Sequence, residues 1–253
     1  MSGHSKWSTI KHKKGVADQR RGQLFTKLTR EIIVAARAGG GDAEMNFRLR
    51  LAVETARSQN MPKDNIERAI KKGTGEGGEG GQLEEITYEG YGPGGAGIII
   101  QALTDNKNRT ASDIRSRLTK GGGNLAAANA VAWNFERKGQ IVVTVDEGDP
   151  DEFALQAVDA GAEDVDVQGT SVTLTAPFAG FEPLRAKISE MKGGHVDQAE
   201  VAMISKSNVA LDHGKAMQML RLMDALEDLD DVQKVYSNAD FPDAVLAEYA
   251  NAS

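Results

Sequence analysis

The sequence of 253 residues contains no cysteine, and this absence excludes disulfide bonds, zinc sites with thiolate ligands and cysteine nucleophiles. Phenylalanine, tryptophan and tyrosine make up only 5% of the residues, so the cores must be built mainly from aliphatic side chains and alanine. No apolar run approaches the ~20 residues of a membrane-spanning helix, and no apolar stretch near the N-terminus is typical of a secretory signal. We therefore expect a soluble, cytoplasmic protein without a membrane partner.

Acidic residues are missing from the first fourteen positions, which read MSGHSKWSTIKHKK. This segment combines lysines and histidines with an aromatic ring, and these groups contact phosphates and stack on bases. A flexible, solubilising tail would explain the lysines but not the tryptophan and isoleucine. The composition therefore predicts a nucleic-acid-binding arm whose contact residues are His4, Lys6, Trp7, Lys11, His12, Lys13 and Lys14.

The charge of the chain is strongly polarised along its length. Residues 1–72 carry 16 basic and 7 acidic side chains, whereas residues 146–253 carry 7 basic and 22 acidic ones. The net charge of the whole chain is −7, but such a polarised chain can bind a polyanion at one end and repel it at the other. The acidic pI is therefore compatible with nucleic-acid binding by the first third.

Residues 1–72 are predicted to form the basic arm and a small helical domain. Apolar residues recur with the 3.6-residue period over 20–37, and further helices are expected over 43–58 and 62–72. The face opposite the apolar stripe of the first helix is basic. The predicted nucleic-acid site is therefore extended to Arg20, Arg21, Lys27 and Arg30.

A glycine-rich segment, GTGEGGEGG over 73–81, separates the helical region from the rest. Its glycines match G-x-G-x-x-G, but a dinucleotide fingerprint must follow a strand and open a helix. This segment follows a helix, and its glutamates would repel a pyrophosphate. We interpret it as a linker.

The remainder of the chain predicts two α/β domains. Residues 139–207 contain strands at 140–145, 163–167, 171–175 and 196–204 and helices at 150–160 and 181–192, in the ferredoxin-like β-α-β-β-α-β order. The flanking segments, 82–138 and 208–240, supply strands at 83–90, 97–104, 130–136 and 231–238 and helices at 111–120 and 212–226. The fold class is therefore α+β: an N-terminal helical domain followed by two ferredoxin-like α/β domains, the last inserted into the middle one. Residues 241–253 are expected to be a C-terminal tail.

The sequence contains no recognisable set of catalytic side chains. The four histidines are spaced too widely for a metal site on one helix, and the strand carboxylates Glu84, Glu85 and Glu89, with Asp105, are typical of a solvated face. We therefore predict that the protein is not an enzyme and has no metal, cofactor or small-molecule substrate.

A second polar segment, DNKNRT, lies just before the predicted helix at 111–120, where Thr110 and Asp113 fit a capping box. Four hydrogen-bond donors at a helix N-terminus are suited to an anion. A capped, solvent-facing turn explains the same residues equally well. The possible second site comprises Asn106, Lys107, Asn108 and Arg109.

Several long motifs resemble the YebC family: GHSKW followed by IKHKK, DQRRGQLFTKLTREI at 18–32, MPKDNIERAIKKGTGE at 61–76, YEGYGPGG at 88–95, ALTDNKNRT at 102–110 and WNFERKG at 133–139. The similarity extends over essentially the whole chain. It implies a three-domain fold with an N-terminal helical domain and two α/β domains. Bacterial members are usually labelled probable transcriptional regulators that bind DNA, whereas mitochondrial members, and some bacterial ones, are understood as translation factors acting with the ribosome.

Together these observations predict a non-enzymatic, nucleic-acid-binding regulator of gene expression. A ribosome-associated translation factor that contacts rRNA or tRNA is favoured, because the densest basic run precedes the first convincing helix and suits irregular RNA. A transcriptional regulator that binds duplex DNA is the alternative. The sequence specifies no oligomeric state.

Overall fold

The computed structural model describes residue 7 and residues 18–76 and 83–252 of the chain. The described residues divide into two compact units: residues 134–206 form one, and the residues before and after them form the other. The fold is α+β, with an N-terminal helical region followed by sheets of antiparallel strands, and this confirms the predicted fold class. We describe each unit by itself.

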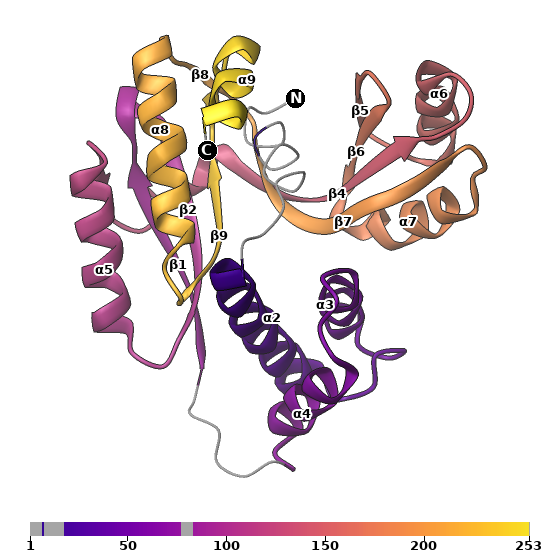
Figure 1. The fold of residues 1–253 in the computed structure, drawn as a ribbon, viewed down its shortest axis with the longest axis horizontal. Coiled ribbons are helices and arrows are strands. Elements are labelled where there is room, and N and C mark those ends of the chain that lie inside the picture. Colours follow the sequence, from indigo (N-terminus) through magenta and orange to yellow (C-terminus); the bar gives the residue numbers. More distant parts are fainter. Residues whose placement is uncertain (1–6, 8–17, 77–82, 253) are drawn as a thin grey trace. The chain divides into compact units, whose positions relative to one another are not determined.

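The helical region consists of α2 (Asp18–Gly39), α3 (Phe47–Ser58) and α4 (Lys63–Thr74) (Figure 1). Asn46 caps α3 by accepting a hydrogen bond from the backbone N–H of Leu49, and its own amide donates to the carbonyls of Ala35 and Gly40 at 2.8 Å. Helices α2 and α4 approach closely at Gly73, where an added Cβ would lie 2.6 Å from the carbonyl oxygen of Ile33. Burial of aliphatic side chains holds the three helices together.

The middle sheet has the strand order β3-β1-β2-β9, and all its pairs are antiparallel. Its strands are β1 (Glu84–Tyr91), β2 (Gly97–Thr104), β3 (Asn124–Leu125) and β9 (Val232–Ser237). Helices α5 (Lys107–Lys120) and α8 (His213–Glu227) lie side by side on one face of this sheet (Figure 1). Nearly every residue of β2 is buried, as expected for a central strand, and its bounds match the predicted 97–104.

Several elements of this unit differ from the prediction or were not predicted. The edge strand beside β1 is β3 at 124–125 rather than 130–136, because the backbone N–H groups of residues 129, 131 and 132 bond to the Glu89 carboxylate instead of a neighbouring strand. Residues 132–134 form a 3₁₀ turn. The predicted tail forms helix α9 (Asp243–Ala252), whose Val245 and Leu246 are buried in the same core as the apolar face of α8. The short strands β8 (Val209–Ala210) and β10 (Ala239–Asp240) pair in parallel.

The unit 134–206 has the ferredoxin-like chain order: β4 (Phe135–Val145), α6 (Pro150–Ala160), β5 (Asp164–Gln168), β6 (Ser171–Pro177), α7 (Phe181–Glu190) and β7 (Gly194–Ser205). Its strands are ordered β5-β6-β4-β7 and all pairs are antiparallel. Helices α6 and α7 pack against each other and against the sheet. The chain enters and leaves this unit at adjacent points, because the N–H of Lys206 donates to the carbonyl of Asn134 at 2.7 Å.

Candidate nucleic-acid interface

Most of the predicted arm lies outside the described residues. This applies to His4, Lys6, Lys11, His12, Lys13 and Lys14, and to the side chain of Arg20. Their predicted role in nucleic-acid binding therefore stays a prediction.

Trp7 is described, and its position differs from the prediction. Its side chain is 3% exposed and belongs to the core cluster that contains Ile98 of β2, Met219 of α8 and Leu246 of α9. The sequence interpretation placed this indole in solvent, where it would stack on an unpaired base. A ring enclosed by aliphatic side chains has no open face for stacking, so burial assigns Trp7 to the core instead.

The basic face of α2 is partly occupied by internal contacts. Lys27 Nζ donates to the carbonyl of Glu227 at the end of α8. Arg30 Nη1 donates to the carbonyl of Asp230 at 2.6 Å and to Oδ1 of Asp231 at 2.7 Å. Lys27 and Arg30 therefore fasten α2 to the turn between α8 and β9, and phosphate contacts through them would have to displace these bonds. Arg21, the other predicted contact residue of α2 with a described side chain, is exposed.

Asp231 is the centre of a polar cluster that draws on four segments of the chain. Besides Arg30, its carboxylate accepts hydrogen bonds from Thr110 at 2.7 Å, Arg109 at 3.0 Å and Thr104 at 3.1 Å. Burial alone would raise the pKa of the Asp231 carboxyl, but the hydrogen bonds from Thr110, Arg109 and Arg30 outweigh it and hold the pKa below its ordinary value. The Asp231 carboxylate therefore has its hydrogen-bond partners within the protein, and Arg30 and Arg109 neutralise its charge.

The segment DNKNRT opens α5, which begins at Lys107 rather than at 111. Asn106 is the N-cap and accepts from the N–H of Arg109 at 3.1 Å, so the expected capping box at Thr110 does not form, and Thr110 is buried instead.

Lys107 forms an ion pair with Glu84, and Arg109 pairs with Asp105 and Asp231. Among the four residues of the possible second site, only the exposed side chain of Asn108 has no hydrogen bond or ion pair to another described residue.

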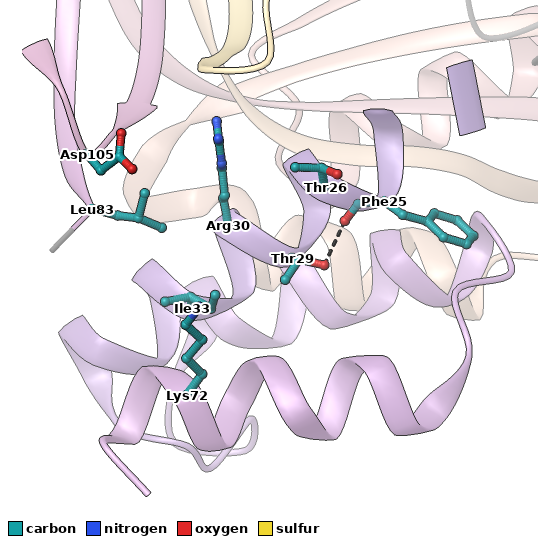
Figure 2. Close-up of a pocket in the computed structure, with 8 residues that line it drawn as sticks. All are labelled: Phe25, Thr26, Thr29, Arg30, Ile33, Lys72, Leu83 and Asp105. Atoms are coloured by element: carbon teal, nitrogen blue, oxygen red, sulfur yellow. Dashed lines mark hydrogen bonds between the residues drawn. The ribbon is translucent and has the colours of Figure 1, made fainter. Parts of the chain in front are cut away.

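Two hollows border Arg30. One hollow, of about 380 Å³, is lined by residues of α2 together with Lys72, Leu83 and Asp105. In Figure 2, Phe25 lies on the opposite side of α2 from Leu83 and Asp105. The other, of about 500 Å³, is lined mainly by carboxylates beside the guanidinium groups of Arg30 and Arg109. These carboxylates are Asp105, Asp113, Asp228, Asp230 and Asp231. Their excess makes the second hollow unfavourable for a phosphate.

Sequence reasoning missed a set of exposed, unpaired cations on helices α3 and α4. Within the described chain, no ion pair or hydrogen bond engages the exposed side chains of Arg57, Arg68, Lys71 and Lys72. Three of them lie on α4, whose buried side carries Ile66 and Ala69. The amphipathic pattern of residues 63–74 could have identified this basic face, because it fixes which side of the helix is outward.

Histidine, aspartate and glutamate do not gather into a metal-binding group among the residues with described positions. Across the same residues, every helix is too short or too polar to cross a membrane.

Comparison with known proteins defines the class to which this fold belongs. Residues 5–76 match the family described as "TACO1/YebC protein N-terminal domain", and residues 83–239 match "TACO1/YebC second and third domain". The chain therefore belongs to the TACO1/YebC family, as the motifs predicted.

Close relatives and a solved structure agree with this assignment. The chain is similar to a "probable transcriptional regulatory protein" of Desulforapulum autotrophicum, with 54% identity over 97% of this chain and 98% of the relative. A protein of Dehalococcoides mccartyi with the same description is 52% identical over 98% of both chains. The crystal structure of a conserved hypothetical protein from Aquifex aeolicus superposes with a TM-score of 0.83 at 45% identity and covers 92% of this chain and 96% of its own.

Proposed function

We propose that this protein is a non-enzymatic regulator of gene expression that binds RNA and acts on translation at the ribosome, in the cytoplasm. The observation that carries the proposal is the polarised charge: 16 basic against 7 acidic residues over 1–72. Part of this excess positive charge remains available for contacts with phosphates. The side chains of Arg57, Arg68, Lys71 and Lys72 are exposed and unpaired within the described chain. A basic arm followed by such a face can follow a phosphate backbone.

The residue types favour RNA over sequence-specific reading of duplex DNA. Reading base edges in the major groove requires side chains such as arginine, asparagine or glutamine that are presented by a free helix. Arg30 of α2 is bonded to Asp230 and Asp231, and two of the free cations of α4 are lysines, which act as point charges toward phosphates. Contacts between lysine side chains and phosphates are suited to irregular RNA, whose shape rather than groove pattern is recognised.

A second candidate function, transcriptional regulation through duplex DNA, is favoured by the descriptions of the relatives from Desulforapulum and Dehalococcoides. It requires tight binding to one duplex sequence over competitor DNA. The predicted arm would then contact the DNA backbone beside a groove-reading helix.

Sedimentation of cell extract through a sucrose gradient separates the two functions. We expect the wild-type protein to travel with ribosomal particles, and a variant with Lys11, Lys13 and Lys14 replaced by glutamate to stay at the top. The matched control carries the same replacement at three lysines in the acidic part of the chain, which are Lys192, Lys206 and Lys215. This control changes the charge equally and should still sediment. Absence of the wild-type protein from ribosomal fractions, combined with tight binding to one duplex sequence, would establish the transcriptional function instead.

A further inference from the structure

Trp133 is the exposed tryptophan of the described chain. Its side chain is 69% exposed, whereas Trp7 is 3% exposed. The indole is nevertheless held in place, because its Nε1–H donates to the carbonyl of Ala130 at 3.0 Å. The hydroxyl of Tyr91, on β1, donates to the same carbonyl at 3.2 Å. The ring is therefore anchored at one edge and open to solvent elsewhere.

A buried carboxylate organises the backbone that leads to this tryptophan. Glu89 is 8% exposed, and its carboxylate accepts hydrogen bonds from the N–H groups of Asn129 at 2.6 Å, Val131 at 2.8 Å and Ala132 at 2.9 Å. Burial would raise the pKa of the Glu89 carboxyl, but these backbone bonds dominate and lower it. Asn129 has a φ of 65°, a left-handed conformation that asparagine tolerates better than most residues. The loop is thus held in shape before any ligand arrives.

The surroundings of Trp133 match the chemistry of an unpaired base. The loop after β3, residues 126–133, contains no charged side chain and is built mainly from alanine, so small neighbours leave the indole accessible. The exposed side-chain amide of Asn129 has no hydrogen bond to another described residue. Amides bond to base edges, and indoles stack on base faces with little sequence preference.

The same observations disfavour an apolar protein partner. The other large exposed hydrophobic residues of the described chain are Met45, Leu155, Val158 and Phe178, and none belongs to this loop. A protein-docking surface normally presents a contiguous apolar patch. A single fixed ring, in a loop that also carries an unbonded amide, suits a flat ligand with a polar edge.

We propose that the loop formed by residues 126–133 is a base-binding site in which Trp133 stacks on an unpaired RNA base and the amide of Asn129 contacts its edge. This proposal rests on the proposed function and assigns to it a contact that does not depend on charge. The basic residues would supply affinity for phosphates, and the loop would supply preference for single-stranded segments.

The test uses the full-length chain and a fluorescein-labelled single-stranded oligoribonucleotide, with the same sequence in a duplex for comparison. Trp133→Ala should weaken binding to the single strand by about 5- to 150-fold, the range that corresponds to loss of one stacked base. The slope of log affinity against log salt should stay unchanged, because no cation is removed. Trp133→Tyr should restore part of the affinity. RNA should also quench the tryptophan emission of the wild type more than that of Trp133→Phe.

Leu155→Ala is the matched control, because Leu155 is 68% exposed but lies on α6, outside both the loop and the basic first third of the chain, and it should leave affinity unchanged. A wild-type protein that binds no RNA would contradict the proposed function itself. Equal RNA affinities of the wild type and Trp133→Ala, or a preference of the wild type for the duplex, would overturn only the base-binding site. Loss of ribosome association in Trp133→Ala with unchanged RNA affinity would also overturn it, in favour of a protein contact.

Discussion

Arg30 Nη1 lies 2.7 Å from Oδ1 of Asp231, and this ion pair joins α2 to the residue that precedes β9, an edge strand of the middle sheet. The side chain of Asp231 is 10% exposed and that of Arg30 is 21% exposed, so both are largely removed from water. Two threonines and a second arginine complete the shell of the carboxylate. Removing one member of such a pair destabilises the fold by more than the intact pair stabilises it, because the remaining charge is buried without a partner.

Replacement of Asp231 by asparagine should therefore destabilise the protein by about 1.5–3 kcal/mol, the range for hydrogen bonds to charged groups. Urea unfolding monitored by circular dichroism measures the change. Asp230→Asn is the matched control, because Asp230 is exposed and contributes only its backbone carbonyl to Arg30. Equal stabilities of the two variants would show that the Asp231 cluster does not support the fold.

The buried Glu89 carboxylate predicts a pH dependence of stability. Its pKa is lower in the folded state than its ordinary value of 4.5, so its ionised form stabilises the fold at neutral pH. This contribution diminishes as the pH falls below 4.5 and is lost once the pH passes below the folded-state pKa. Glu89→Gln should therefore lower the free energy of unfolding at pH 7 and flatten its decline in acid. Glu190→Gln, at an exposed position, should keep the wild-type profile.

The close approach of α2 and α4 predicts opposite effects of alanine at two helical glycines. Gly73→Ala places a Cβ 2.6 Å from the carbonyl oxygen of Ile33 and should cost about 1–3 kcal/mol, as other overpacked substitutions do. Gly22→Ala meets no atom within 4 Å and should stabilise α2 by about 0.5–1 kcal/mol through its higher helix propensity. Thermal melts of the two variants that shift in the same direction would contradict this packing.

Burial of Trp7 has a direct spectroscopic consequence. In Trp133→Phe, Trp7 is the sole tryptophan, and its emission should be blue-shifted and protected from acrylamide. Addition of RNA should leave that emission unchanged. Trp7→Ala should lower stability by about 3–5 kcal/mol, the usual range for a large buried aromatic side chain. A red-shifted, freely quenched Trp7 would instead support its interpretation from sequence as a stacking group.

Local signals predicted much of the fold. The strand at 97–104 and the helix at 150–160 have the observed bounds, because the first is a short apolar run and the second lies between an aspartate cap at Asp149 and Gly161 in the left-handed conformation. The misplaced edge strand has a non-local cause. Residues 130–136 are apolar enough for a strand, but the N–H groups of Val131 and Ala132 donate to the carboxylate of Glu89, about 40 positions away, and residues 135–136 belong to β4.

The internal contacts of the candidate site residues were not predictable, for the same physical reason. A helical period identifies the outward face of α2, but no local pattern shows that Lys27 and Arg30 bond to residues about 200 positions later. The partners of Arg109 and the core position of Trp7 are likewise set by tertiary contacts. Composition revealed where positive charge is concentrated; only the fold shows which of these charges are neutralised.

The hydrogen bond between Lys206 and Asn134 also affects how the chain can fold. Strand β9 must join a sheet whose other strands precede it by more than a hundred residues, and closing a long flexible loop costs entropy that grows with its length. When residues 134–206 fold first, the β4–β7 ladder brings the N–H of Lys206 to 2.7 Å from the carbonyl of Asn134, and most of the loop is already closed. The inserted unit thereby shortens the loop that pairing of β2 with β9 has to close, which should accelerate assembly of the middle sheet.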